Sequence, residues 1–307
     1  MQAFSVGIGA WQALSASFET GATVVSVARR SLYCQAGTDL LCVGSEAIER
    51  GPINILLNDD DWKMLRGSVT VGTRLKFKDN LACGPMDINW SKSIIFAAKC
   101  PEATGVTAPQ ANLKNLWNLL YLQGKGPVAE TVGYLLGRQG LTSSDPVMNK
   151  VKKKIVYSLK LLKKGWQRPY CRPDLAEAVK NLLGLGPGLT PLGDDFLVGY
   201  LSGLTLVGDR NGVSQGLRSE LRVLIIDHLA QTNEISQAHL RWACAGYYTE
   251  PLILLLTGLA EGNQRHLHPA IINLLQRGAT SGTDTAAGLL WALEHGKEMH
   301  NGYSMAH

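Results

Sequence analysis

The sequence lacks several features that would name a class of protein at once. None of its apolar runs reaches the ~18 residues that a membrane-spanning helix needs. Its first residues have neither the basic region nor the long apolar stretch of a secretory signal. Its six cysteines include no Cys-x-x-Cys pair, and its seven histidines are dispersed. We therefore expect a reduced, cytoplasmic protein with no membrane span and no metal held by cysteine or histidine.

Charge is also sparse. Charged residues make up 18% of the chain and hydrophobic residues 45%, with a net charge of +5. This composition is typical of a folded protein, and its mild positive charge permits anionic ligands without requiring nucleic acid. Most of the lysines that cluster lie on one face of an expected helix over 147–164. That face could meet an acidic partner, but no aromatic residues interleave to stack bases, so we favour a solvated face and expect neither nucleic acid nor membrane as a partner.

The sequence pattern changes near Cys100 and Pro101. Before this point, many short β-branched or alternating runs are separated by Gly and Asn/Asp turns, which is typical of a small antiparallel barrel or sandwich. After Pro109 the apolar spacing becomes helical, as in residues 112–121. The sequence therefore predicts an α+β protein, with a mainly β domain over 1–105 and an all-helical domain over 106–307.

The most informative stretch is a glycine-rich loop that leads into a helix. It reads Leu-Gly-Leu-Gly-Pro-Gly-Leu-Thr-Pro-Leu-Gly-Asp-Asp from Leu183 to Asp195. Thr190 and Pro191 look like the N-cap and first residue of that helix. Such a loop gathers free N–H groups that can hold a phosphate or carboxylate. It is neither a P-loop nor a dinucleotide fingerprint, and a tight, capped turn between two helices would also explain it.

Part of this stretch occurs twice. Gly193-x-Asp195-x-x-x-Gly199 matches Gly282-x-Asp284-x-x-x-Gly288, with each position displaced by 89 residues. The match continues as Gly203 against Ala292, so each copy has two small residues four apart. Small residues at that spacing lie on one helix face and let another backbone approach. We therefore expect two similar helices packed near each other, each presenting an aspartate at its N-terminus. These aspartates either cap their own helices or share a pocket, in which Asp195 and Asp284 would orient a polar substrate or Mg²⁺.

A polar cluster between the two copies begins another expected helix. Thr232 or Asn233 would be its N-cap, and Ser236 would lie near its third position. The same side chains could hydrogen-bond a carboxamide or a carbonyl, although capping alone would also explain them.

The three motifs together resemble one bacterial domain family. They are Gly186 to Leu197, Thr232 to Ser236, and Ser281 to Asp284, in that order. This set is similar to the AllH-type subunit family of oxamate carbamoyltransferase, which belongs to anaerobic allantoin degradation and so to purine catabolism. The resemblance covers roughly 180–295 and is loose over the β-rich region.

The resemblance implies a subunit that works in a hetero-oligomer with FdrA-type and YlbE-type proteins. Together they would interconvert oxalurate plus phosphate with oxamate plus carbamoyl phosphate. This chain would bind a small anionic substrate at its helix N-termini, with Mg²⁺ as a candidate cofactor. Two alternatives remain: a non-catalytic scaffold that docks an acidic partner through the lysine-rich helix, and a stand-alone acyl- or carbamoyl-transfer enzyme with another substrate.

The expected site residues fall into two groups. The candidate catalytic residues are Asp194, Asp195 and Asp284. The candidate substrate- or phosphate-binding residues are Gly186, Gly188, Leu189, Thr190, Gly193, Asn233, Ser236, Ser281 and Gly282. Neither a Ser-His-Asp set nor an obvious nucleophilic cysteine is present, which favours direct transfer over a covalent intermediate.

Overall fold

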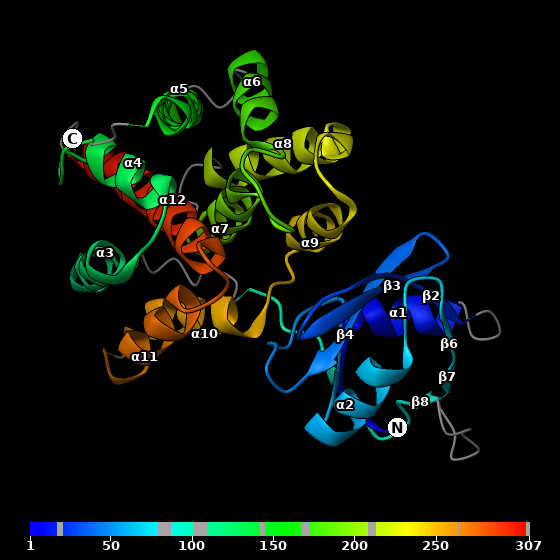
Figure 1. The fold of residues 1–307 in the computed structure, drawn as a ribbon. Helices are drawn as coiled ribbons and strands as arrows, with labels where there is room; N and C mark the ends of the chain where they lie inside the picture. Colours follow the sequence, from blue (N-terminus) through cyan, green and yellow to red (C-terminus); the bar gives the residue numbers. More distant parts are fainter. Residues whose placement is uncertain are drawn as a thin grey trace. The chain divides into compact units, whose positions relative to one another are not determined.

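A computed structural model describes most of the chain. It describes residues 1–16, 21–78, 87–100, 110–141, 145–167, 172–207, 213–262 and 264–304. The chain divides into two compact units (Figure 1). The sheet unit comprises Met1–Lys99 and Tyr247–Glu250, and the helical unit comprises Cys100–Gly246 and Pro251–His307. Among the described helices, none combines the length and the apolar character needed to cross a bilayer.

The sheet unit is built on one open, mixed sheet. The order of its seven described strands is β6-β2-β3-β4-β5-β1-β9. They are β1 (Ala3–Gly7), β2 (Ala22–Val27), β3 (Ser31–Ala36), β4 (Asp39–Ser45), β5 (Asn54–Leu57), β6 (Arg74–Leu75) and β9 (Ile94–Phe96). The β2–β3, β3–β4, β1–β5 and β2–β6 pairs are antiparallel, whereas the β4–β5 and β1–β9 pairs are parallel. Two further strands, β7 (Phe77–Lys78) and β8 (Ile88–Asn89), form a separate parallel pair.

The expectation of an antiparallel barrel or sandwich is therefore wrong, although the α+β class is confirmed. The sheet ends at β6 and β9, which do not pair with each other. Two helices that the strand reading omitted, α1 (Ile8–Ala16) and α2 (Asp59–Ser68), also belong to this unit. Asn58 caps α2 by accepting the N–H of Asp61 at 2.8 Å, and three aspartates in the first turn suit the helix dipole.

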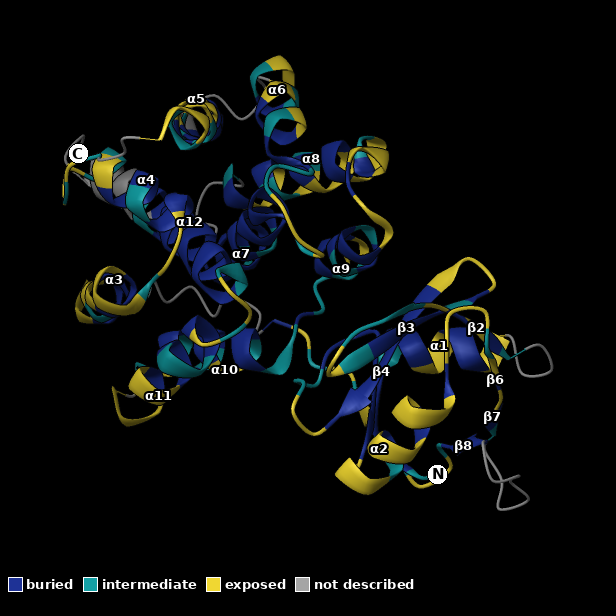
Figure 2. Ribbon diagram, in the orientation of Figure 1, coloured by how far each residue is buried: buried dark blue, intermediate teal, exposed yellow. Residues whose placement is uncertain are grey.

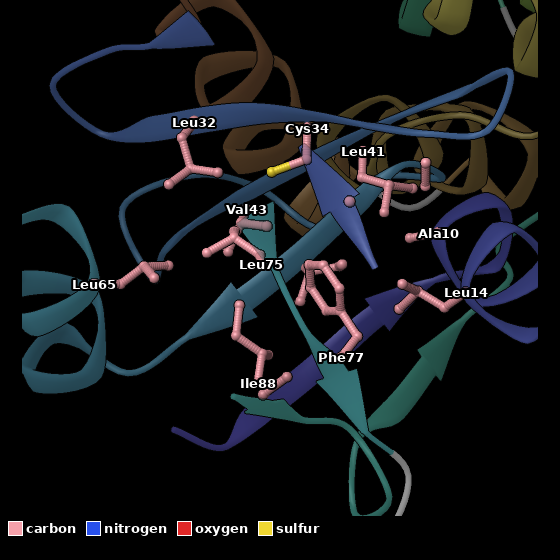
Figure 3. Packing of buried hydrophobic residues seen from close by; sticks show 14 of the residues in the cluster. Ala10, Leu14, Leu32, Cys34, Leu41, Val43, Leu65, Leu75, Phe77 and Ile88 are labelled. Atoms are coloured by element: carbon pink, nitrogen blue, oxygen red, sulfur yellow. The ribbon is translucent and has the colours of Figure 1, made fainter. Parts of the chain in front are cut away.

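Both helices share their apolar core with the sheet. In Figure 3, Leu14 of α1 and Leu65 of α2 belong to the same buried cluster as Leu41 and Val43 of β4. Each such side chain contributes about 1.5–3 kcal/mol when it is fully buried. All predicted site residues lie outside this unit, which leaves the helical unit to carry the candidate site.

The helical unit surrounds two central helices. Its described helices are α3 (Gln110–Gln123), α4 (Pro127–Leu135), α5 (Pro146–Gln167), α6 (Arg172–Leu182), α7 (Leu192–Leu206), α8 (Val213–Asp227), η1 (Leu229–Gln231), α9 (Glu234–Cys244), α10 (Glu250–Glu261), α11 (Gln264–Leu275) and α12 (Ser281–Ser304). α7 and α12 lie side by side at the centre of the unit (Figure 1). Nearly all of α7 and the first half of α12 are buried (Figure 2).

Candidate functional site

The two central helices approach each other through glycines. A Cβ on Gly199 would lie 1.9 Å from the carbonyl oxygen of Thr285, and a Cβ on Gly288 would lie 2.1 Å from that of Phe196. No side chain fits at such distances, so both positions require glycine. The contacts are reciprocal, because Thr285 and Gly288 are the counterparts of Phe196 and Gly199 in the repeat. The expected close packing of the two copies is confirmed.

A third contact shows that the two copies are related by an approximate two-fold axis. A Cβ on Gly203 would lie 2.6 Å from the Cβ of Ala292, which is its own counterpart in the repeat. Contacts between counterpart residues are the mark of a two-fold interface. Because early positions face early positions and later ones face later ones, α7 and α12 run parallel. Asp195 and Asp284 therefore lie at the same end of the helix pair.

The glycines that begin each copy have a packing role. A Cβ on Gly193 would lie 2.0 Å from the Leu182 carbonyl oxygen, and a Cβ on Gly282 would lie 1.8 Å from that of Leu274. Both contacts press the start of a central helix against the end of the preceding helix, α6 or α11. The N–H groups of both glycines already donate hydrogen bonds to carbonyls within the chain, at 3.1 Å. Both glycines are therefore needed for helix packing, and a role of either in ligand binding stays a prediction.

Asp194 is occupied by structural hydrogen bonds. Its Oδ1 accepts the backbone N–H of Gly184 at 2.9 Å, and its Oδ2 accepts the hydroxyl of Thr232. Burial raises the pKa of Asp194, while these hydrogen bonds and the nearby Ser236 hydroxyl oppose the rise. The side chain thus ties the glycine-rich loop to the segment before α9, which leaves it little freedom for chemistry.

Asp195 and Asp284 have the opposite character. Asp284 is 0% exposed, and neither of its carboxyl oxygens makes a hydrogen bond to a described residue. Asp195 is 8% exposed, and its buried Oδ2 also lacks a described partner. Buried carboxyl groups without partners cost free energy and so mark a candidate functional site.

The surroundings of both carboxyl groups raise their pKa values above the ordinary value for aspartate. Burial raises the pKa of Asp284 to about 8, although the Thr280 hydroxyl acts in the opposite direction. Burial also raises the pKa of Asp195 well above its ordinary value; the Ser281 hydroxyl lowers it, and the charge of Asp284 raises it further. Both carboxyl groups therefore keep their protons to a higher pH than an exposed aspartate does.

The glycine-rich loop before α7 presents free backbone donors. Gly184, Gly186 and Gly188 have φ values of 68°, 107° and 105°, which favour glycine. The backbone N–H groups of Gly186, Gly188 and Leu189 donate no hydrogen bond to a described residue. Residues 187–189 are also exposed. Binding of an anion by these donors stays a prediction.

The predicted cap of α7 is wrong by one position. The helix begins at Leu192, and its N-cap is Pro191, which makes no side-chain capping bond. With a ψ of 144°, Pro191 is still extended, so the helix cannot begin there. Thr190 is instead close enough to Asp195 to lower the pKa of that carboxyl group.

The polar cluster before α9 contains the predicted cap. The Oδ1 of Asn233 accepts the N–H groups of Ile235 and Ser236, each at 3.1 Å, which confirms Asn233 as the N-cap. Its amide nitrogen remains the group that could meet a ligand. Ser236 is 1% exposed, and its hydroxyl has no described hydrogen-bond partner. Thr232 holds Asp194, so the three residues have three different roles.

The structure adds one segment that the sequence reading missed, the turn between α3 and α4. A Cβ on Gly126, the N-cap of α4, would lie 3.8 Å from Oδ1 of Asp284. Glycine followed by proline at the first helical position is a signal for the start of a helix. Nothing in the local sequence, however, indicates that this turn contacts the start of α12, which lies 158 residues further along the chain. The N-termini of α4, α7 and α12 thus gather around the carboxyl pair.

Metal ligands are few at this site. Among the described residues, no group of three or more His, Cys, Asp or Glu side chains is placed to hold a metal ion. Asp195 and Asp284 alone would supply two carboxylates. A Mg²⁺ ion there would need its remaining oxygen ligands from substrate, water or another chain.

These features define a helical unit in which two copies of one helix, α7 and α12, pack against each other. A candidate site for a small anion lies at the N-termini of these two helices. Residues 182–293 match the model of the family described as oxamate carbamoyltransferase subunit AllH. The matched stretch is similar to this family and contains both copies of the repeat and the polar cluster, so the resemblance seen in the sequence is confirmed. No solved structure matches the chain.

Proposed function

We propose that this chain is the substrate-binding subunit of a carbamoyltransferase that interconverts oxalurate plus phosphate with oxamate plus carbamoyl phosphate. The observation that carries the proposal is the pair of buried carboxyl groups of Asp195 and Asp284 at paired helix N-termini. Both oxygens of Asp284 and Oδ2 of Asp195 lack a hydrogen-bond partner among the described residues. Both residues lie inside the stretch that matches the carbamoyltransferase subunit family.

The proposed chemistry is one nucleophilic displacement with a proton transfer. A phosphate oxygen attacks the carbamoyl carbon of oxalurate, and the bond between that carbon and the oxamate nitrogen breaks. The attacking phosphate loses its proton, and the leaving nitrogen gains one. A pair with one ionised and one protonated carboxyl group suits both transfers, with Asp195 and Asp284 in these roles.

The anionic groups would bind at the loops that surround this pair. The free N–H groups of Gly186, Gly188 and Leu189 would hold the phosphate and stabilise negative charge that develops during transfer. The amide of Asn233 and the unpartnered hydroxyl of Ser236 would receive the carboxamide. In this proposal the other subunits are FdrA-type and YlbE-type proteins, and they complete the enzyme.

The test is carbamoyl transfer by the assembled complex. Asp195→Asn and Asp284→Asn should each lower transfer at least a hundredfold, because each removes one proton-transfer group that is worth about 10²–10⁴-fold. The matched control is Asp227→Asn, which alters an exposed aspartate at the end of α8 and should leave transfer unchanged. Wild-type transfer rates in both site variants would refute the proposal.

A second candidate, a scaffold subunit, is favoured by the surface of α5. Lys153, Lys154 and Lys160 are exposed on this helix, whereas Lys152 is buried against Glu130. If these three lysines dock an acidic partner, replacing them with glutamine should weaken assembly without changing anion binding. Transfer by the isolated chain would instead indicate a stand-alone enzyme.

A further inference from the structure

The turn between α3 and α4 is fastened to the start of α12. Its three residues, Gly124, Lys125 and Gly126, are called here the Gly-Lys-Gly loop. The backbone N–H of Lys125 donates a hydrogen bond to Oγ1 of Thr283 at 3.2 Å. A Cβ on Gly124 would lie 2.2 Å from the Leu120 carbonyl oxygen, so this position requires glycine. The loop is therefore hydrogen-bonded to Thr283, the residue that directly precedes Asp284 in the sequence.

The end of this loop reaches the buried carboxyl group itself. Gly126 has a φ of 94°, and a Cβ there would lie 3.0 Å from Cγ2 of Thr280 and 3.8 Å from Oδ1 of Asp284. Gly126 is also the N-cap of α4, a helix of nine residues, and it has no side chain to satisfy the helix's first N–H groups. An unpartnered carboxyl group and a helix N-terminus thus face the same small region.

The repeat gives an independent reason to regard this loop as part of the site. Thr283 is the counterpart of Asp194, and each uses a side-chain oxygen to hold a backbone N–H of a glycine-flanked loop. Asp194 holds Gly184 of the glycine-rich loop, and Thr283 holds Lys125 of the Gly-Lys-Gly loop. The two copies therefore present two loops at the shared end of α7 and α12, and one of them carries a cation.

The ammonium group of Lys125 forms no ion pair within the part of the chain that the structure describes. Lys125 is also exposed. Two other basic residues of the helical unit differ in this respect: Lys152 pairs with Glu130, and Arg138 pairs with Glu294. A lysine on a flexible stem between two glycines can follow a ligand as the ligand enters.

We propose that Lys125 binds an oxyanion group, a carboxylate or a phosphate, of the ligand held between Asp195 and Asp284. This inference rests on the proposed function and adds a binding residue to it. A lysine ammonium is a point charge suited to such groups, and a protonated carboxyl group beside it donates a hydrogen bond without repelling the anion. The glycine-rich loop and the Gly-Lys-Gly loop would then hold opposite ends of one ligand, and these two ends would be chemically different groups.

The test measures binding of three small molecules to the full chain, in the assembled complex and alone, by calorimetry. Oxamate carries a carboxylate, inorganic phosphate carries only phosphate oxygens, and oxamide is neutral. Lys125→Ala should weaken binding of at least one anion by about tenfold to a hundredfold, as for loss of a charged hydrogen bond. It should leave oxamide binding and the melting temperature unchanged. The anion that is affected identifies the group that Lys125 binds.

Two further variants complete the test. Lys125→Arg should restore most of the lost affinity because the charge is kept, and Lys114→Ala, which removes an exposed lysine of α3, should behave as wild type. If Lys125→Ala binds both anions as tightly as wild type while Asp284→Asn does not, the role of Lys125 is refuted and the proposed function stands. If the wild-type complex binds neither anion, both are refuted.

Discussion

At the scale of single residues, Asp284 has the most unusual environment of the candidate site. It is fully buried, lacks a described hydrogen-bond partner for either oxygen, and has a pKa of about 8. A carboxyl group in such a place lowers the stability of the folded protein when it ionises. Strained or poorly satisfied groups of this kind cluster at functional sites.

Replacing this carboxyl group should stabilise the fold. Because the folded-state pKa of Asp284 is higher than the unfolded one, the folded protein binds the extra proton, and wild-type stability falls as pH rises from about 4 to about 8. Asp284→Asn removes this loss. Chemical denaturation should show the variant more stable by about 1–2 kcal/mol at pH 8, with a smaller difference at pH 5.

The exposed Asp227 provides the control for that measurement. Asp227→Asn should leave the stability at pH 8 within about 0.5 kcal/mol of wild type, as for most surface substitutions. A variant Asp284→Asn that is less stable than wild type at pH 8 would show that the carboxylate has a compensating partner.

Asn233 supports a second prediction at this scale. Its Oδ1 caps α9, so Asn233→Ala should destabilise the protein by about 1 kcal/mol. Asn233→Asp keeps the capping oxygen but removes the amide donor. If the amide also receives substrate, Asn233→Asp should keep the wild-type melting temperature and lose oxamate affinity. Unchanged affinity would confine Asn233 to capping.

At the scale of secondary-structure elements, the packing of α7 on α12 decides whether the site exists. Both helices contribute an aspartate, and both depend on glycines at their contact. An alanine at Gly199 would place its Cβ 1.9 Å from a backbone oxygen, and the helices would have to separate. Such overpacking typically costs about 1–3 kcal/mol.

We therefore expect Gly199→Ala and Gly288→Ala to lower the melting temperature by several degrees and to weaken ligand binding together. Gly216 offers a matched control, because it lies exposed in α8 with nothing within 4 Å of its Cβ position. Gly216→Ala should raise stability by about 0.5–1 kcal/mol, as expected for a helix interior. Equal effects of the three variants in thermal unfolding would contradict the packing argument.

The sequence predicts these elements unevenly, for physical reasons. The pairing of α7 and α12 is predictable because close approach leaves a trace in the spacing of glycines such as Gly199 and Gly288. The turn at Gly37 between β3 and β4 is of the kind that sequence can predict, since its turn chemistry is local. The parallel pairing of β4 with β5 is not predictable, because strands of four to seven residues carry no mark of direction. The contact of Lys125 with Thr283 joins distant segments and leaves no local pattern.

At the scale of the whole molecule, the candidate site lies within one of two compact units. The helical unit contains the stretch that matches the carbamoyltransferase subunit family, 182–293, and also the missed Gly-Lys-Gly loop before it. Ligand binding should therefore stabilise the helical unit, with protection from hydrogen exchange concentrated at the starts of α4, α7 and α12. Protection that is confined to the sheet unit would place the ligand elsewhere.

The most direct test of the central claim follows oxamate binding by calorimetry as pH passes through 8. If Asp284 faces the ligand, the protonated carboxyl group donates a hydrogen bond below pH 8, and the ionised carboxylate repels the anion above it. Wild-type affinity should then fall by tenfold or more between about pH 7 and pH 9, and Asp284→Asn, which leaves only Asp195 to ionise, should show a clearly smaller fall. The same fall in wild type and variant would show that Asp284 does not meet the ligand.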